Sequence, residues 1–273
     1  MKKSTLLIIV CMVCAFKLSA QVDGFSVSAG LAFPTKIGST DADKNKDTPL
    51  GIATGMGFGL RYQNAIINSN LRYHVNIGMH YHNMSKDGKS LLLESKRALD
   101  AAYGYDRDGS SSINGSKYVY IPIYAGLNYC HPIGTQLSLF GEAGLGVVYQ
   151  IITDQTYTGS YTKSQSGTVG SHYYTNTYTK NTKMVVSWEN AFHFMVHVGI
   201  GFLVSERISV NVYYDWYYGK TTMVSDINTV LERDYSSDVG YNHTTDTDHP
   251  DPVKVKGDAV AEPMFGINVG FHF

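Results

Sequence analysis

The sequence predicts an all-β fold: an eight-stranded antiparallel transmembrane up-and-down β-barrel with four long extracellular loops. Three observations predict it. Apolar and polar residues alternate over eight segments, the charges in those segments share one face, and long and short connections alternate between them. An alternation with period two indicates strands whose two faces meet different solvents.

The segments expected to form strands are residues 25–33, 51–63, 70–83, 117–130, 137–150, 188–204, 208–219 and 259–273. The last segment shows the alternation most clearly. Its odd-numbered residues from Phe265 to Phe273 are apolar, whereas the even-numbered ones are Gly266, Asn268, Gly270 and His272. One face of this strand therefore suits lipid, and the other suits a polar interior.

The charged residues provide a separate test, because a charge that faces lipid near the bilayer centre costs roughly 2–4 kcal/mol. When the lipid-facing side of each segment is assigned from its apolar residues alone, six charges fall on the opposite face: Arg61, Arg72, Glu142, Glu189, Asp215 and Glu262.

The connections are long at 34–50, 84–116, 151–187 and 220–258, and short at 64–69, 131–136 and 205–207. Short turns of such barrels lie on the periplasmic side, so both termini are expected there and the long loops outside. A soluble β-sandwich is the alternative, but it rarely needs strands this long.

The N-terminus has the order of a secretory signal peptide. Lys2 and Lys3 precede an apolar stretch over residues 6–16, and small residues end at Ala20. We expect residues 1–20 to be removed and residues 21–273 to form one outer-membrane β-barrel domain. The apolar stretch is shorter than the ~18 residues that a membrane-spanning helix needs.

Charge and cysteine content exclude other classes. Removing Lys2, Lys3 and Lys17 changes 22 basic and 23 acidic residues to 19 and 23, a net charge of -4. No clustered basic face is present, so the sequence does not predict a nucleic-acid partner. Cys130 is the one cysteine beyond the signal, which leaves no intramolecular disulfide.

Residues 118–127 contain Ile121, Pro122 and Ile123 followed by Gly126. This stretch resembles the "IPI…G" strand of Bacteroidetes outer-membrane β-barrel proteins of the PorT-like kind, within the OmpA-like eight-stranded barrels. The resemblance implies that Phe265, Phe271 and Phe273 belong to a signal read by the barrel assembly machinery. It also implies an accessory role in protein secretion or transport as one alternative function.

An eight-stranded barrel has an interior that side chains can fill. We therefore expect an internal ion-pair network, since buried charges require partners. Its members are Arg61, Arg72, Glu142, Glu189 and Asp215. A proton or ion path through the same residues is the alternative.

Six histidines fall on inward-facing positions, which raises the question of a metal: His74, His80, His82, His193, His197 and His272. His193 and His197 lie some 13 Å apart along a strand, too far for one ion, so no metal and no cofactor is predicted. Catalysis is not predicted either, because no Gly-x-Ser-x-Gly or His-Glu-x-x-His motif occurs. His131, His172, His243 and His249 are the histidines in turns or loops.

The long loops differ in composition. Residues 91–102 favour a short amphipathic helix that could act as a lid. Residues 106–110 resemble part of a calcium loop but lack its remaining ligands, so a turn is expected. The fourth connection is expected to be a mobile loop, with Pro250 and Pro252 excluding a continuous strand.

The third connection contains alternating tyrosines that could prolong its flanking strands as a hairpin. The proposed surface contacts are Tyr157, Tyr161, Tyr173, Tyr174 and Tyr178. A Thr/Tyr ribbon that only tolerates water and lipopolysaccharide sugars is the alternative.

The sequence thus predicts a non-enzymatic outer-membrane barrel that serves envelope structure or surface binding. An accessory barrel of a secretion or transport assembly and a narrow small-solute channel are the alternatives. The expected partners are outer-membrane lipid and lipopolysaccharide, the barrel assembly machinery, and a surface ligand or secretion-system proteins.

Overall fold

The computed structural model describes residues 24–34, 52–66, 69–84, 110–115, 117–237, 240–248, 253–256 and 260–273, with single positions at 86, 89, 93 and 251. The predicted signal peptide, the first long loop and the helix proposed over 91–102 lie essentially outside these residues. No helix in the described part of the chain is long and apolar enough to cross a membrane.

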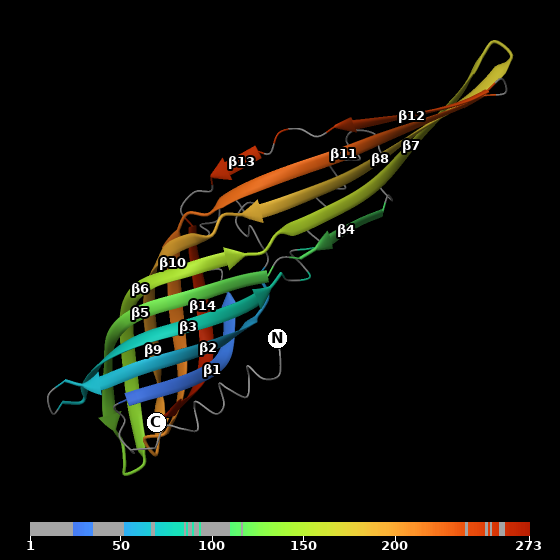
Figure 1. Ribbon diagram of the computed structural model, residues 1–273. Coiled ribbons are helices and arrows are strands. Elements are labelled where there is room, and N and C mark those ends of the chain that lie inside the picture. The colour runs from blue at the N-terminus through green and yellow to red at the C-terminus, as the bar shows by residue number, and fades with distance from the viewer. Residues whose placement is uncertain are drawn as a thin grey trace, which may run out of the picture.

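Eight strands close into an antiparallel barrel in the order β1-β14-β10-β9-β6-β5-β3-β2 (Figure 1). They are β1 (Gly24–Pro34), β2 (Gly55–Ala65), β3 (Leu71–Asn83), β5 (Lys117–Pro132), β6 (Leu137–Ile152), β9 (Ala191–Val204), β10 (Ile208–Gly219) and β14 (Val260–His272). Each barrel strand pairs with the preceding and following barrel strands, and β14 closes onto β1. The predicted fold is confirmed as a closed eight-stranded antiparallel barrel.

The observed barrel strands agree closely with the predicted segments, because their two faces differ so strongly. Outward positions carry the large exposed apolar side chains, whereas inward positions carry buried polar and aromatic ones. The tight turn between β9 and β10 places Ser205 and Glu206 at φ 50° and 56°, and the amide of Arg207 donates to the carbonyl of Val204 at 3.1 Å. Positive φ at both central residues is typical of a type I′ β-turn, and the register pairs Val204 with Ile208, so three residues, 205–207, connect the two strands.

A second, six-stranded sheet extends from the end of the barrel opposite the short turns (Figure 1). It contains β4 (Ser110–Asn114), β7 (Gln155–Val169), β8 (His172–Trp188), β11 (Thr222–Ser237), β12 (Gly240–Asp248) and β13 (Val253–Lys256). The order is β12-β11-β8-β7-β4, with β13 also paired to β11. We refer to these six strands as the distal sheet.

The distal sheet joins the barrel through very short links. Two residues separate β6 from β7, β8 from β9, and β10 from β11. The amide of Lys117 donates to Oγ1 of Thr153 at 2.8 Å, and the amide of Thr153 donates to the carbonyl of Lys117 at 3.0 Å. The amide of Glu189 donates to the carbonyl of Thr222 at 2.9 Å. The barrel strands therefore continue into the sheet with little interruption.

This sheet corrects two expectations. The hairpin predicted in the third connection exists as β7 and β8, but the fourth connection is not the expected mobile loop. Its residues form β11, β12 and β13, because β11 pairs with β8 over 15 residues. Ser110, assigned to a turn, begins β4. β12 ends at Asp248 and β13 begins at Val253, and the expectation for Pro250 and Pro252 falls on residues outside those described.

Candidate functional site

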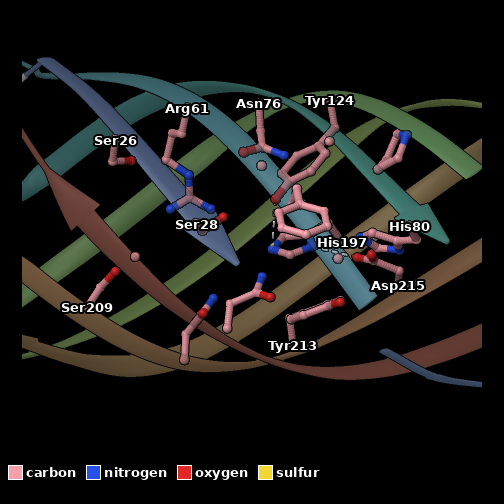
Figure 2. A pocket seen from close by; sticks show the side chains of 18 of the residues that line it. Ser26, Ser28, Arg61, Asn76, His80, Tyr124, His197, Ser209, Tyr213 and Asp215 are labelled. Carbon is pink, nitrogen blue, oxygen red and sulfur yellow. Dashed lines mark hydrogen bonds and ion pairs between the residues drawn. The ribbon is translucent and has the colours of Figure 1, made fainter. Parts of the chain in front are cut away.

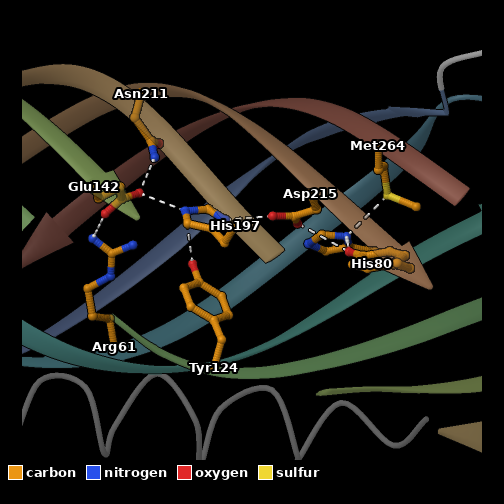
Figure 3. Close-up of polar contacts among 9 residues, drawn as sticks. Arg61, His80, Tyr124, Glu142, His197, Asn211, Asp215 and Met264 are labelled. Atoms are coloured by element: carbon orange, nitrogen blue, oxygen red, sulfur yellow. Dashed lines mark hydrogen bonds and ion pairs between the residues drawn. The ribbon is translucent and has the colours of Figure 1, made fainter. Parts of the chain in front are cut away.

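The barrel interior contains a buried network of charges centred on Glu142 of β6 (Figure 3). Arg61, from β2 across the interior, lies with Nη1 2.6 Å from Oε2 of Glu142. Oε1 of the same carboxylate accepts from His197 Nε2 at 3.0 Å and from Asn211 Nδ2 at 3.2 Å. Gly199 lies opposite Glu142 in the register, and a Cβ there would crowd the Glu142 side chain.

His197 of β9 lies between two carboxylates. Its Nε2 faces Glu142, and its Nδ1 lies 2.5 Å from Oδ1 of Asp215, its direct neighbour on β10. Both ring nitrogens can donate at the same time only when the imidazole is protonated. With His197 as a cation, the two positive groups Arg61 and His197 balance the two carboxylates, which is the pairing that a buried cluster requires.

The network continues from Asp215 toward the distal end of the barrel. The hydroxyl of Tyr217 donates to Asp215 Oδ2 at 3.2 Å and lies 3.2 Å from Nδ1 of His80. The same His80 nitrogen is 3.3 Å from the sulfur of Met264. Aromatic stacking supports these contacts, with Tyr124 4.5 Å from the His197 ring.

Next to this network, toward the distal sheet, the interior contains a plug of buried, mostly large side chains. Tyr120 and Tyr217 stack with ring centroids 5.5 Å apart. The members of the plug are Ala32, Met84, Tyr118, Tyr120, Tyr124, Val148, Ile152, Met195, Tyr217 and Met264.

The remaining space beside the charge network is small. The interior cavity measures about 40 Å³ and is lined by Ser26, Ser28, Arg61, Tyr124, His197 and Asp215, among others (Figure 2). One buried water needs on the order of 10–15 Å³ of this kind of volume, so the cavity has room for only a few. The charge network and the plug thus occupy much of the described barrel interior.

The structure separates the five residues predicted to form the internal network. Arg61, Glu142 and Asp215 come together through His197. Arg72 is on β3 toward its short-turn end, opposite Asn128 of β5. The prediction that Glu189 lies inside the barrel is wrong, because Glu189 lies in the link between β8 and β9 and is exposed. Its segment was predicted to start at 188, but β9 starts at Ala191.

All six inward-facing histidines are buried. They contact different partners along the barrel: His193 Nε2 is 2.8 Å from Oε1 of Gln150, and His272 Nε2 is 3.0 Å from Oγ of Ser209. In the described part of the chain, no group of three or more His, Cys, Asp or Glu side chains has the geometry to hold a metal ion.

Three side chains on the distal sheet are connected in the manner of a catalytic triad. His243 Nδ1 lies 2.7 Å from Oδ1 of Asp234, and His243 Nε2 lies 3.1 Å from Oγ1 of Thr245. These groups are exposed on a strand surface, where water is not excluded and a nucleophile is not activated by burial. The arrangement therefore carries no catalytic assignment. His131 and His172 are exposed, and His249 lies outside the described residues.

The five tyrosines predicted as surface contacts occupy different environments. Tyr157 and Tyr161 are buried, with hydroxyl oxygens 2.5 Å apart. They therefore do not form the surface contacts that the sequence predicts. Tyr174 is half-buried and stacks on Tyr235, and Tyr178 lies under the guanidinium of Arg233. Only Tyr173 is largely exposed. The alternation of the tyrosines was visible in the sequence, but not which face would be covered.

Phe265 and Phe271 lie on the outward face of β14, and Phe273 follows its last residue. The rings of Phe271 and Phe273 are 5.1 Å apart. The amide of Phe273 donates to the carbonyl of Phe25 at 2.9 Å, which brings the two ends of the barrel chain together.

The burial of tyrosines on β5 and β10 was not predicted from the sequence. Tyr118, Tyr120 and Tyr217 occupy inward positions but resemble outward aromatic residues in composition. The signal that was available is the alternation along the strand: a residue an even number of positions from an inward-facing group also faces inward, as Tyr217 does two residues after Asp215.

No model of a known protein family matches this sequence, and a search of curated proteins found no match. Among solved structures, the chain is similar to Ail, the attachment invasion locus protein of Yersinia pestis. The identity is 12%, the match covers 92% of this chain and 99% of that chain, and the TM-score is 0.35. A major outer membrane protein from Thermus thermophilus matches at 12% identity over 92% and 98% of the two chains, with a TM-score of 0.33.

The outer membrane protein AlkL, solved in DMPC lipid bilayers, matches at 14% identity over 94% of each chain, with a TM-score of 0.40. At these identities and TM-scores the likenesses add nothing to what the strand order itself establishes about the fold.

Proposed function

We propose that this chain is a non-enzymatic outer-membrane β-barrel with a sealed interior, which binds ligands at the cell surface through its distal sheet. The observation that carries the proposal is the contrast between the two parts. The barrel interior contains a charge network and a plug, while a six-stranded sheet extends beyond one barrel end. The barrel anchors, and the sheet is the accessible surface.

The outer surface of the barrel supports a membrane location. Every barrel strand exposes large apolar side chains, including Leu145 at 59%, Ile200 at 54% and Val269 at 54%. Soluble monomers rarely expose contiguous apolar patches beyond a few hundred Å². A belt that runs around the whole barrel is instead what acyl chains would cover.

Aromatic residues at both ends of this belt support the same conclusion. Phe25 and Tyr62 lie 5.2 Å apart near the short turns, and Tyr149 and Phe192 lie 4.7 Å apart near the distal sheet. Aromatic rings of this kind gather at the two lipid–water interfaces of membrane barrels. The membrane and its lipopolysaccharide are thus the first partners we propose.

Orientation follows from the turns. The short connections and the paired ends near Phe25 and Phe273 share one end of the barrel, which we place in the periplasm. The distal sheet is then extracellular. The outward aromatic residues Phe265, Phe271 and Phe273 suit a role in recognition by the barrel assembly machinery during insertion.

Surface binding is tested with a variant in which the hairpin tip, here residues 157–184, is removed. These residues lie between the paired Thr156 and Val185 and are replaced by Asn-Gly, which retains the barrel strands. Cells with the wild-type protein should adhere to glycan- or protein-coated surfaces, and cells with the variant should lose that adhesion. Equal adhesion at equal surface abundance would contradict the proposal.

A channel function is tested by planar-bilayer recording. The plug and the small cavity predict no conductance steps for the wild type or for Glu142→Ala. Stable single-channel steps in either protein would contradict the sealed interior and favour a proton or ion path.

An accessory role in secretion or transport rests on the PorT-like resemblance of residues 118–127 and remains the second candidate. In the structure these residues lie on β5, with Tyr118 and Tyr120 in the plug. Mild crosslinking in cells distinguishes the two roles. Stoichiometric capture of envelope proteins that persists after removal of the hairpin tip would favour the accessory role.

A further inference from the structure

One face of the distal sheet is rich in hydroxyl and amide side chains. Residues opposite one another in antiparallel strands point to the same side. Ser112 lies opposite Thr158, Thr158 opposite Lys183, and Lys183 opposite Asn228. The next row in the register contains Ser110, Ser160, Asn181 and Val230. We call the side shared by these two rows the hydroxyl face.

The hydroxyl face is hollowed into a groove of about 420 Å³ across four strands. Ser110, Ser112, Thr158, Lys183 and Asn228 are all exposed there. The volume falls within the range of sites that hold small ligands. By contrast, the opposite face carries the buried Tyr157 and Tyr161, so the two faces of the sheet differ in both chemistry and exposure.

The hydroxyl groups are held in place by pairing across strands. Ser112 and Thr158 hydroxyls lie 2.8 Å apart, and the pattern repeats toward the tip with Ser166 and Thr175 at 3.1 Å. A hydroxyl both donates and accepts, so each member of such a pair retains capacity for a ligand. The face therefore offers ordered donors and acceptors in rows separated by the strand spacing of ~4.8 Å.

A second feature of the same face lies farther along β11. Asp234 is four residues beyond Val230, a distance of ~13 Å along a strand, and it points to the same side. The hydroxyl of Tyr241 donates to its Oδ1 at 2.6 Å. Tyr241 is 68% exposed, which leaves a flat ring available for packing, and His243 Nδ1 lies 2.7 Å from the same carboxylate oxygen.

These features together select a ligand class. Lys183 is the only charged side chain among the groove residues, so a polyanion would find one cation rather than the cluster that binds it. Val230 is the only large apolar one, so an apolar ligand or peptide anchor finds little surface to bury. A neutral sugar chain matches, because its hydroxyls pair with Ser, Thr and Asn while the C–H face of a ring packs on tyrosine.

We infer that the hydroxyl face binds a neutral oligosaccharide or polysaccharide from outside the cell, with one sugar in the groove and another near Asp234 and Tyr241. This rests on the proposed extracellular position of the sheet. Thr158 is six residues beyond the end of β6, or ~20 Å along the strand, so the site lies well beyond the end of the barrel.

The test uses the full-length protein in a detergent without a sugar head group. Calorimetry is run with cellohexaose, maltohexaose and mannohexaose, and separately with a heparin hexasaccharide and with purified lipopolysaccharide. We expect saturable binding of at least one neutral hexasaccharide. Asn181→Ala and Asn228→Ala should each weaken it about fivefold, since each removes hydrogen bonds worth roughly 1 kcal/mol. Tyr241→Ala should weaken it by a similar factor or more.

Asn242→Ala is the matched control, because Asn242 lies opposite Tyr235 and so points to the other face. It should change affinity less than twofold. The inference is overturned if no neutral hexasaccharide binds saturably, if only heparin or lipopolysaccharide binds, or if Asn242→Ala weakens binding as much as Asn181→Ala. Heat-dependent gel mobility of each variant reports the folded barrel. A folded, detergent-requiring protein without sugar binding overturns this inference alone, whereas a protein soluble without detergent overturns the proposed function.

Discussion

The charge network inside the barrel gives the sharpest stability prediction, through Glu142→Gln. The carboxylate is fully buried and contacts Arg61 at 2.6 Å, His197 at 3.0 Å and Asn211 at 3.2 Å. Replacing it with an amide leaves two buried cations facing one carboxylate, Asp215. Removing one partner of a buried ion pair costs roughly 3–5 kcal/mol, which corresponds to about two to four powers of ten in the unfolding equilibrium.

The assay is equilibrium unfolding in urea from lipid vesicles, followed by tryptophan fluorescence and gel mobility. Glu232→Gln on the distal sheet is the matched control and should change the free energy of unfolding by less than about 0.5 kcal/mol. The double variant Arg61→Gln/Glu142→Gln restores the charge balance, so it should be more stable than the sum of the single losses by about 1–3 kcal/mol. Strict additivity, or a Glu142→Gln loss no larger than that of Glu232→Gln, would refute the network.

Three further results are expected. Gly146→Ala should destabilise the barrel by about 1–3 kcal/mol in the same assay, because the added Cβ would meet the backbone of the neighbouring β5. Gly134→Ala is the control and should leave the stability unchanged, since Gly134 has open space around it. Equal losses in the two variants would contradict this packing. Glu206→Gly should raise stability by about 1 kcal/mol, since glycine removes the strain of a left-handed residue in the β9–β10 turn; a loss of stability would argue against that turn. The pKa of Asp234 should lie below its ordinary 3.8 because the Tyr241 hydroxyl donates to the carboxylate. The interaction is therefore present above pH 3.8 and is lost as the pH falls through the lowered pKa. Tyr241→Phe should raise the pKa of Asp234 in an NMR titration, and an unchanged pKa would contradict the contact.

The barrel was predictable from the sequence because two physical requirements act on every strand. Outward positions must suit lipid and inward positions must not, so the apolar alternation defines both strand and face. The prediction of 208–219 coincides with β10 for this reason. The alternation fails where a strand leaves the barrel, as at Glu189, because neither face of the distal sheet is required to be uniformly apolar.

The distal sheet and the network show the limits of such reasoning. Residues 222–248 are rich in Thr, Ser, Asp and Asn on both faces, so their pairing as β11 and β12 depends on contacts with β8 that no local pattern encodes. Parity places Arg61 and Glu142 inside the barrel. It does not place them at the same depth, because that depends on the stagger of β2 and β6 across the interior. His197, which joins Glu142 to Asp215, was recognised as inward but not as the link.

The central claim is that the outward side chains of the barrel contact acyl chains while the distal sheet stands in water. Fluorescent labels on single cysteines at Val198 and at Ser164, in a Cys130→Ser background, test it directly in lipid vesicles. The label at Val198 should be quenched by brominated acyl chains and protected from iodide, and the label at Ser164 should show the reverse. A Val198 label that is open to iodide and unaffected by brominated lipid would contradict the account.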